Sequence, residues 1–433
     1  MALGGGTFTV QNKQLPGAYI NFVSASSANA ALSERGIVTM PLKLDWGRER
    51  EVFEVNTESF RKNSREIFGY EYTHDKLKGL RDLFKNARTL YAYRIGGGEK
   101  AANSFAKAKY GGERGNALSV AISEESENLF TVKTLLDGKE VDIQTVSGAN
   151  ELSGNPYLDF IPEAELAATA GTPLSGGSDK TDADGDYADY LNKIESFGFN
   201  VMAADVSDST LKGMFADFTK RMRDEMGIKF QLVLHDYPEA DHMGVISVKN
   251  KATDENAPKE SLVYWVAGAE AGCAVNKSCQ NKRYDGEFTV NTDYTQSQLK
   301  AASAGGEFVL HKVGSDIRVL EDRNTLTTLN EQLGEVFRDN QTVRVTDQIA
   351  NDIAVLFNTK YLGTVPNDSA GRVSLWTDIV KHHEQLKNIR AIENFSDSDV
   401  TVTQGETKKS VAVNDAVTVV NAMSKLYMTV NVN

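Results

Sequence analysis

The hydrophobic pattern of this chain changes its period several times, and those changes limit the possible folds more than any other feature. Residues 19–95 contain two strand-like stretches, AYINFVSAS and RGIVTMPLKLDWG, and end in a buried strand pattern, TLYAYRI. A helical stretch lies between them, with apolar residues at Leu77, Leu80, Leu83 and Phe84. Apolar residues that recur about every 3.6 residues indicate a helix, and apolar residues at every second position indicate a strand. We therefore expect an α/β block over residues 19–95.

The pattern changes at Gly96, where short alternating strands replace the mixed pattern. The strand-like stretches are ALSVAI, LFTVKTLL and KEVDIQTV, and the turns around them include GGERGN and LDGKE. Closely spaced short strands of this kind are typical of an all-β unit. The sequence therefore predicts a small all-β insert over residues 96–178, which ends in a loop-like hinge, GTPLSGGSDKTDADGDY.

Residues 179–329 alternate between helical and strand patterns. Strands are expected at FNVMAADV, KFQLVLHDY and HMGVISVKN, and helices at YADYLNKIESF, TLKGMFADFTKRMRDEMG and SLVYWVAGAEAG. That order favours a layered α/β domain with a partly parallel sheet. The fold class predicted for the whole chain is α/β, or α+β overall, in several domains.

The last hundred residues have the strongest helical pattern. One apolar stripe comprises Ile349, Ile353, Leu356 and Phe357, and a second comprises Trp376, Ile379, Val380, His383 and Leu386. Two amphipathic helices are therefore expected here. The stretch NFSDSDVTVTQGETKKSVAVNDAVTVVNA follows them and predicts a β-hairpin that turns near Gly405.

Both ends of the chain carry strand patterns. At the C-terminus, Leu426, Met428, Val430 and Val432 would point to one side of a strand, and Tyr427, Thr429 and Asn431 to the other. At the N-terminus, three glycines precede Thr7, Phe8, Thr9 and Val10, and the turn pair Pro16-Gly17 follows. We predict an N-terminal arm over residues 1–18 and a terminal strand over 424–433. The hairpin near Gly405 is one candidate partner for that strand.

Composition argues against several classes of protein. The net charge of −13, without an evident basic face, argues against nucleic-acid binding. The chain lacks a run of about eighteen apolar residues, so no membrane span is expected. The start, MALGGGTFTV, lacks the features of a secretory signal, which favours synthesis in the cytoplasm. Cys273 and Cys279 have no second pair and no nearby histidine, so we expect reduced thiols rather than a zinc site.

One cluster is a candidate for acid–base or metal chemistry. His235, Asp236, Asp241 and His242 fall within eight residues at a predicted strand end. The two histidines are seven residues apart across a loop that contains a proline, so nothing in the pattern places them on one face. The simpler interpretation is a group of surface polar residues in a turn.

Other motifs do not meet the requirements of the sites that they suggest. In a calcium loop with Asp182 and Asp184 as ligands, Lys180 and Leu191 would occupy positions that need oxygen ligands. The glycines at 96–98 lack the serine or threonine and the upstream glycine of a phosphate loop. His383 lies on an apolar stripe and is expected to be a packing residue. We therefore predict neither a metal nor a cofactor.

Several stretches resemble the tail sheath proteins of contractile phages and of phage-tail-like bacteriocins, in their compact form. These stretches are PGAYINFVS, YGGERGN, GTPLSGGSD, RVTDQIANDIAVLFNTKYLG, RVSLWTDIVKHHEQLKNIRAIENF and NAMSKLYMTVNV. The resemblance covers essentially the whole chain. It implies an N-terminal arm (1–18), a first α/β block (19–95), a β-sandwich insert (96–178), a subtilisin-like α/β domain without a catalytic triad (179–329), a sheath C-terminal domain (330–423) and a C-terminal strand arm (424–433).

The resemblance implies a structural subunit rather than an enzyme. Sheath subunits of this family form hexameric rings that stack around a tail tube and contract to drive the tube through a target cell envelope. The implied partners are further copies of the chain, the tail tube protein, and the baseplate and tail-terminator proteins. Nucleic acid, a cofactor and direct membrane insertion are not implied. The implied location is a virion or a phage-tail-like particle assembled in the bacterial cytoplasm.

The resemblance also implies roles for particular residues. The arms that join subunits would contain Thr7, Phe8, Thr9 and Val10 at one end, and Leu426, Tyr427, Met428, Thr429, Val430 and Val432 at the other. The second C-terminal helix would face the tube through Lys381, His382, Lys387 and Arg390. Two alternatives remain open: a hydrolase with His235 as its base, and a soluble binding module whose β insert recognises a surface ligand.

Overall fold

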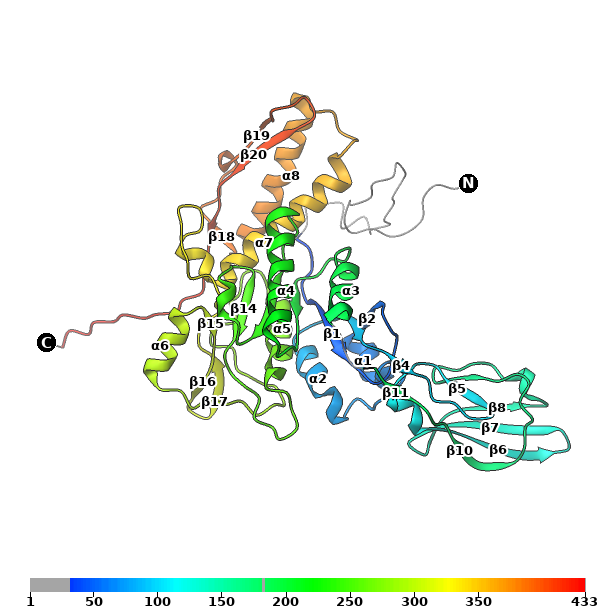
Figure 1. The fold of residues 1–433 in the computed structure, drawn as a ribbon. Coiled ribbons are helices and arrows are strands. Elements are labelled where there is room, and N and C mark those ends of the chain that lie inside the picture. Colours follow the sequence, from blue (N-terminus) through cyan, green and yellow to red (C-terminus); the bar gives the residue numbers. More distant parts are fainter. Residues whose placement is uncertain (1–31, 181–183, 433) are drawn as a thin grey trace. The chain divides into compact units, whose positions relative to one another are not determined.

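In the computed structural model of this chain, the described residues are 32–180 and 184–432 (Figure 1). They divide into two compact units. The large unit comprises residues 32–38, 79–88 and 196–432, and the small unit comprises the described residues of 39–78 and 89–195. The predicted N-terminal arm, the stretch AYINFVSAS and Asp182 lie outside the described residues.

The first part of the small unit mixes strands and helices. Strand β3 (Thr89–Ile95) coincides with the predicted TLYAYRI and lies between β1 (Ile37–Lys43) and β2 (Val52–Asn56). The helices are α1 (Thr57–Phe68) and α3 (Asp184–Ile194). Helix α1 was not predicted from the sequence, because most of its residues are polar and it buries only Phe60, Ser64 and Phe68.

The β insert is built on an antiparallel sheet in the order β10-β6-β7-β8. These strands are β6 (Leu118–Ser126), β7 (Leu129–Leu136), β8 (Lys139–Val146) and β10 (Thr169–Pro173). Their inward residues form one core with Trp46 and with the paired strands β5 (Ala106–Ala108) and β9 (Leu158–Phe160). Strands β4 (Gly98–Glu99) and β11 (Ser178–Asp179) pair where the chain enters and leaves the insert. The three strands predicted here are confirmed.

The large unit contains a parallel sheet, as the alternation of helices and strands predicted. Its strands are β12 (Val201–Ala203), β13 (Gln231–His235), β14 (Val245–Val248) and β15 (Glu307–Phe308). Every residue of β13 and β14 is buried. Such burial is typical of parallel strands whose two faces are both covered.

Helices pack directly on this sheet. Helix α4 (Ser209–Lys220), which continues as a π-helical turn (Arg221–Glu225), lies against β13, and α5 (Leu262–Gly272) lies against β12, β13 and β14. Nearly every residue of α5 is buried. A Cβ atom at Gly268 would lie 2.3 Å from the carbonyl oxygen of Leu83 in α2 (Lys78–Phe84), so this close approach requires glycine. The unit also contains α6 (Gln296–Ala304) and the hairpin of β16 (Leu310–Val313) and β17 (Asp316–Val319).

The C-terminal part of the large unit is built around two long helices (Figure 1). Helix α7 (Asn340–Leu356) continues as a π-helical turn (Phe357–Tyr361), and α8 (Ser369–Asn388) follows. Their predicted apolar stripes meet in one core with Val275 and Phe395. Strand β18 (Ile392–Glu393) pairs with β21 (Thr418–Val419), and β19 (Val400–Gln404) pairs with β20 (Val411–Asp415). Both helices and the hairpin near Gly405 are therefore confirmed.

Within residues 32–180 and 184–432, no helix is both long enough and apolar enough to cross a lipid bilayer.

Candidate assembly surface

The packed part of the C-terminal region ends at Ala422, where buried Gln341 of α7 holds the chain. The Gln341 side-chain nitrogen donates to the carbonyl oxygen of Val420 at 3.0 Å, and its side-chain oxygen accepts from the Ala422 N–H at 2.9 Å. The Val420 N–H donates in turn to the carbonyl oxygen of Ala391 at 3.0 Å. These hydrogen bonds fix the chain on α7 immediately before its last residues.

Residues 423–432, which we call the terminal segment, extend beyond this anchor (Figure 1). Their side chains are exposed to solvent. The apolar row of the predicted strand is exposed to 85% at Leu426, 74% at Met428, 67% at Val430 and 90% at Val432. The segment forms no strand with any described residue, and the strands of the hairpin near Gly405, β19 and β20, pair with each other. The hairpin near Gly405 is therefore not its partner in this structure.

Two small sheets close to the anchor have unpaired edges. The pairs β18–β21 and β19–β20 contain two strands each, so each strand has one edge without a hydrogen-bonded neighbour in the part of the chain that the structure describes. Unpaired N–H and C=O groups at such an edge are a template for another strand. The same region therefore presents both a strand-forming segment and edges that could accept one.

Helix α8 presents basic side chains to solvent. Lys381 and Lys387 are exposed on the helix, and Arg390 is exposed just after its end. The Lys387 ammonium donates to the carbonyl oxygen of Phe395 at 2.8 Å, which holds this side chain at the end of the helix. Three of the four residues predicted to face a tube are therefore accessible.

The fourth, His382, is not accessible, and this part of the prediction is wrong. His382 is 1% exposed, and its Nε2 lies 2.9 Å from a carboxylate oxygen of Asp352 in α7. One residue along a helix turns the side chain by about 100°, which directs His382 toward α7 while Lys381 faces solvent. The neighbouring His383 is also buried, with Nε2 2.8 Å from an Asp415 carboxylate oxygen, so its predicted role as a packing residue is confirmed.

The four residues of the proposed acid–base cluster have separate partners. His235 ends strand β13 and is buried, which lowers its pKa, and its Nε2 has no hydrogen-bond partner among the described residues. The Asp241 carboxylate instead accepts the backbone N–H groups of Thr327 at 2.6 Å and Thr328 at 2.9 Å. His242 lies 3.2 Å from Asp224. These residues do not converge on one site, and His235 lies in the interior rather than on the surface.

A buried ionic group joins α5 to α7. It was not predicted from the sequence, because its members are far apart in the chain. The Arg344 guanidinium donates to Glu270 at 2.5 Å and to Asp322 at 3.3 Å, and all three side chains are fully buried. Burial and the neighbouring Asp322 raise the pKa of Glu270. Burial also acts to raise the pKa of Asp322, but the Arg344 guanidinium outweighs this effect and the pKa of Asp322 is lowered. Arg344 therefore lies between two buried carboxyl groups whose pKa values shift in opposite directions.

The same group has the composition of a metal site. Oxygen atoms of Glu270 and Asp322 and the Cys279 sulfur lie within 4.8 Å of one another. Arg344 already donates to both carboxyl groups and supplies the positive charge between them. The arrangement therefore balances its charge as an ion pair, although Glu270 Oε1 and Arg344 Nε have no hydrogen-bond partner among the described residues, and we assign it a structural role.

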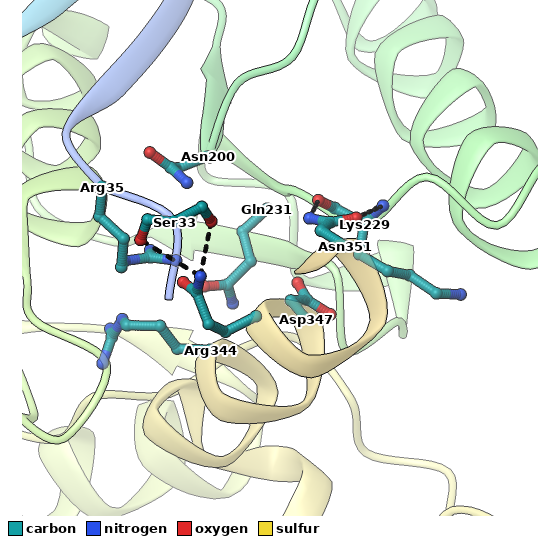
Figure 2. A pocket seen from close by; sticks show the side chains of 9 residues that line it. Ser33, Arg35, Asn200, Lys229, Gln231, Arg344, Asp347 and Asn351 are labelled. Carbon is teal, nitrogen blue, oxygen red and sulfur yellow. Dashed lines mark hydrogen bonds between the residues drawn. The ribbon is translucent and has the colours of Figure 1, made fainter. Parts of the chain in front are cut away.

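A polar pocket lies beside this group (Figure 2). It is lined by Ser33, Arg35, Asn200, Lys229, Gln231, Arg344, Asp347, Gln348 and Asn351. Its volume of about 20 Å³ holds about one water molecule. Asn200 precedes β12 and Gln231 begins β13, so the pocket lies at the amino ends of parallel strands, whereas ligands bind at the carboxyl ends. The pocket is therefore a place where polar side chains pack together rather than a substrate-binding site.

Four families of sheath domains match consecutive parts of the chain. The Tail sheath protein Gp18 domain III N-terminal region matches residues 35–95, and the phage tail sheath protein beta-sandwich domain matches 96–180. The phage tail sheath protein central domain matches residues 183–325, and the phage tail sheath C-terminal domain matches 333–433.

Full-length relatives agree with these matches. The chain is 32% identical over 470 residues to the phage-like element PBSX protein XkdK of Bacillus subtilis, with 100% of both chains covered. A crystal structure of a sheath tail protein from Desulfitobacterium hafniense is 37% identical, covers 90% of this chain and 93% of its own, and gives a TM-score of 0.79. The contracted helical sheath of the anti-feeding prophage shares the fold, with 13% identity, 97% and 100% coverage and a TM-score of 0.59. The chain therefore belongs to the phage tail sheath protein family.

Proposed function

We propose that this chain polymerises into hexameric rings that stack around a tail tube, and that the stack contracts to drive the tube through a target cell envelope. The observation that carries the proposal is the terminal segment, an alternating apolar strand that is anchored at Ala422 and exposed beyond it. A monomer gains nothing from exposing such a row, whereas an assembly can cover it. The particle would be a phage virion or a phage-tail-like particle, assembled in the bacterial cytoplasm.

The terminal segment would add a strand to a sheet edge of a neighbouring copy. Strand addition supplies backbone hydrogen bonds for affinity, and the alternation of side chains sets the register. The unpaired edges of β18–β21 and β19–β20 are the acceptors that we favour. Residues Thr7, Phe8, Thr9 and Val10 would form the second arm, although they lie outside the described residues.

Energy estimates explain why such an arm is effective only in a lattice. Burying Leu426, Met428, Val430 and Val432 yields about 6–12 kcal/mol at most. Ordering the backbone of eight residues costs about 8–16 kcal/mol, and each new hydrogen bond returns about 0.5–1.5 kcal/mol. The net free energy of one arm is therefore close to zero. Many arms engaged in one ring reinforce each other through their high effective concentration.

The other parts of the chain would form the rigid blocks between these arms. We propose a subtilisin-like α/β domain over residues 179–329, a first α/β block over 19–95, an insert over 96–178 and a sheath C-terminal domain over 330–423. The parallel strands β12 to β15 and their helices support the α/β assignment. During contraction these blocks would rotate and repack while the arms keep neighbouring copies connected.

The main test is a chain truncated after Ser424. We expect a folded monomer that forms neither rings nor tubes when examined by negative-stain electron microscopy, while the full chain assembles under the same conditions. Tubes of normal length from the truncated chain would refute the role of the arm. An absence of tubes from the full chain, even with tube and baseplate proteins present, would refute the sheath function itself.

A matched pair of point variants tests the strand register. Met428→Lys places a charge in the apolar row, and Thr429→Lys places the same charge on the opposite side of the strand. We expect the first variant to prevent polymerisation and the second to retain it. Equal loss in both variants would indicate that the segment does not pair as a regular strand.

The proposed partners are the tail tube, the baseplate and the tail terminator. We propose that the exposed basic side chains of α8, Lys381 and Lys387, together with Arg390, contact the tube. The double variant Lys387→Glu/Arg390→Glu should then reduce co-sedimentation of sheath with tube, and most strongly at low salt. Lys408→Glu/Lys409→Glu changes the same charge in an exposed turn and serves as the control. Unchanged assembly of the first variant would refute this contact.

A further inference from the structure

The two cysteines of the chain lie together at the C-terminal end of helix α5. Cys273 is the C-cap residue that follows α5, and Cys279 follows after a short loop. The two side chains hydrogen-bond to each other, and the Cys279 sulfur also lies 3.4 Å from the carbonyl oxygen of Ala269. Both thiols are free in the structure. The mechanical role proposed above leaves this pair without a function.

The loop between the cysteines is held in place by hydrogen bonds at both ends. Arg35 donates to the carbonyl oxygen of Cys273 at 3.0 Å, and Arg344 donates to that of Lys277 at 2.7 Å. The Cys279 N–H donates to Asp322 at 2.8 Å. The backbone therefore keeps the thiols close without a covalent bond, so little conformational entropy remains to be lost when one forms.

The two thiols differ in exposure and in their surroundings. The hydrogen bond from Cys279 lowers the pKa of Cys273 to about 7; burial opposes this change, and Arg344 and Arg35 add to it. The same hydrogen bond, together with full burial, raises the pKa of Cys279. Cys273 is also the more accessible of the two. A thiolate is the reactive form, so Cys273 has the properties of the attacking group and Cys279 those of the resolving group.

We propose that Cys273 and Cys279 form an intramolecular disulfide by exchange with an oxidised low-molecular-weight disulfide such as glutathione disulfide. The Cys273 thiolate attacks one sulfur of the reagent, forms a mixed disulfide and releases one glutathione thiolate. Cys279 then loses its proton to solvent and attacks the Cys273 sulfur, which releases the second glutathione thiolate. Two protein thiols are oxidised and one reagent disulfide is reduced to two thiols, so electrons and protons balance.

The position of the loop gives the disulfide a mechanical consequence. Val275 lies in the core formed by α7 and α8, and the Asn276 side chain donates to the carbonyl oxygen of Ile389 at 2.6 Å. A bond between Cys273 and Cys279 would close this loop while the C-terminal helices rest on it. Oxidation would therefore strengthen the attachment of those helices to α5 after the protein leaves a reducing compartment.

The test uses the full chain, reduced, freed of reductant and exposed to glutathione disulfide at neutral pH. After acid quenching and alkylation of the remaining thiols, mass spectrometry should show that both thiols disappear together in a monomer lighter by two hydrogens. Cys279→Ala should accumulate a glutathione adduct on Cys273, and Cys273→Ala should leave Cys279 unmodified. A stable adduct on the wild-type chain, dimers linked through cysteine, or two thiols that remain alkylatable would each overturn the proposal.

Alkylation rates supply a second readout that does not depend on disulfide closure. Cys279→Ser retains a hydrogen-bond donor beside Cys273, whereas Cys279→Ala removes it. We expect the iodoacetamide reaction of Cys273 near pH 7 to be about tenfold slower in the alanine variant than in the wild-type chain, with the serine variant between them. Equal rates in all three proteins would show that the two thiols do not interact, and this result would also overturn the proposal.

Discussion

The interior around α5 and α7 and the terminal segment contrast within one folding unit. In the interior, charged side chains far apart in the sequence are fully buried and paired, as Arg344 is with Glu270 and Asp322. In the terminal segment, apolar side chains such as Leu426 and Val432 are almost fully exposed. The first region therefore pairs its charged groups within the chain, whereas the second leaves its apolar surface for contacts that a single copy cannot make. Stability and assembly should consequently depend on different residues.

The largest effect is expected from Arg344→Ala. This substitution leaves Glu270 and Asp322 buried without their cation, which should lower the free energy of unfolding by about 3–5 kcal/mol. Urea unfolding of the monomer, followed by circular dichroism, would measure the loss. The exposed control Lys381→Ala should change stability by less than about 0.5 kcal/mol. A similarly small change for Arg344→Ala would show that the buried ionic group does not stabilise the interior.

A pH-dependent effect is expected from Asp82 in α2. Burial raises the pKa of Asp82 to about 6, although the backbone N–H of Glu287, which it accepts at 2.8 Å, opposes the shift. Because the folded state binds this proton more tightly than the unfolded state, ionisation of Asp82 destabilises the fold. The protonated Asp82 carboxyl group therefore contributes to the free energy of unfolding at acidic pH. This contribution is at most about 3 kcal/mol and is lost as the pH rises from about 4 through 6.

Asp82→Asn removes this titration while retaining an oxygen acceptor. The difference in unfolding free energy between the wild-type chain and the variant, measured at several pH values, should therefore change between pH 4 and pH 7 and favour the wild type at the acidic end. A difference that is independent of pH would contradict the raised pKa. The terminal segment contains no carboxyl side chain, so its truncation should not alter this profile.

A smaller effect is expected at the boundary between the two regions. Gln341→Ala removes the hydrogen bonds to Val420 and Ala422, which should cost about 1–2 kcal/mol. Hydrogen exchange at the Ala422 amide should become faster because the anchor opens more often. Gln341→Glu places a buried carboxylate oxygen against the carbonyl oxygen of Val420, so its effect should be larger than that of alanine. Unchanged exchange in the alanine variant would indicate that the anchor lies elsewhere.

The smallest effect on stability is expected from truncation after Ser424. The removed side chains are exposed, so the free energy of unfolding of the monomer should change by less than about 0.5 kcal/mol. Thermal and urea unfolding below the concentration of assembly would test this expectation. A loss above about 1 kcal/mol would mean that the segment packs on its own chain, and the contrast between the two regions would no longer hold.

Elements with a strong local period were predictable from the sequence. The alternating stretches of β7 and β8 and the apolar stripes of α7 and α8 occur where the pattern indicated. Helix α1 was missed because its polar residues carry little periodic signal and its caps decide its bounds instead. The burial of His382 was also not predicted, because this residue lies outside the apolar stripe of α8 and its partner, Asp352, belongs to another helix.

The buried polar contacts were outside the reach of pattern analysis. Arg344 lies 74 residues from Glu270, and Arg223 lies 124 residues from its partner Asp347. Hydrophobic periodicity describes which face of an element is buried, but it does not identify the partner of a charged residue that lies on that face. The contact between Cys273 and Cys279 was also not predicted, because five intervening residues can form many different loops and only some of these bring the two thiols together.

The sequence alone determined the type and order of most elements, and it marked residues 424–432 as capable of forming a strand. Local period and turn residues carry that information, and they require no knowledge of the other elements. Only the tertiary structure decided that this segment has no partner among the described residues of its own chain and that Arg344 pairs with two carboxyl groups in the interior. Both outcomes depend on which residues distant in the sequence contact each other in the fold, because a hydrogen bond or a buried surface requires two partners.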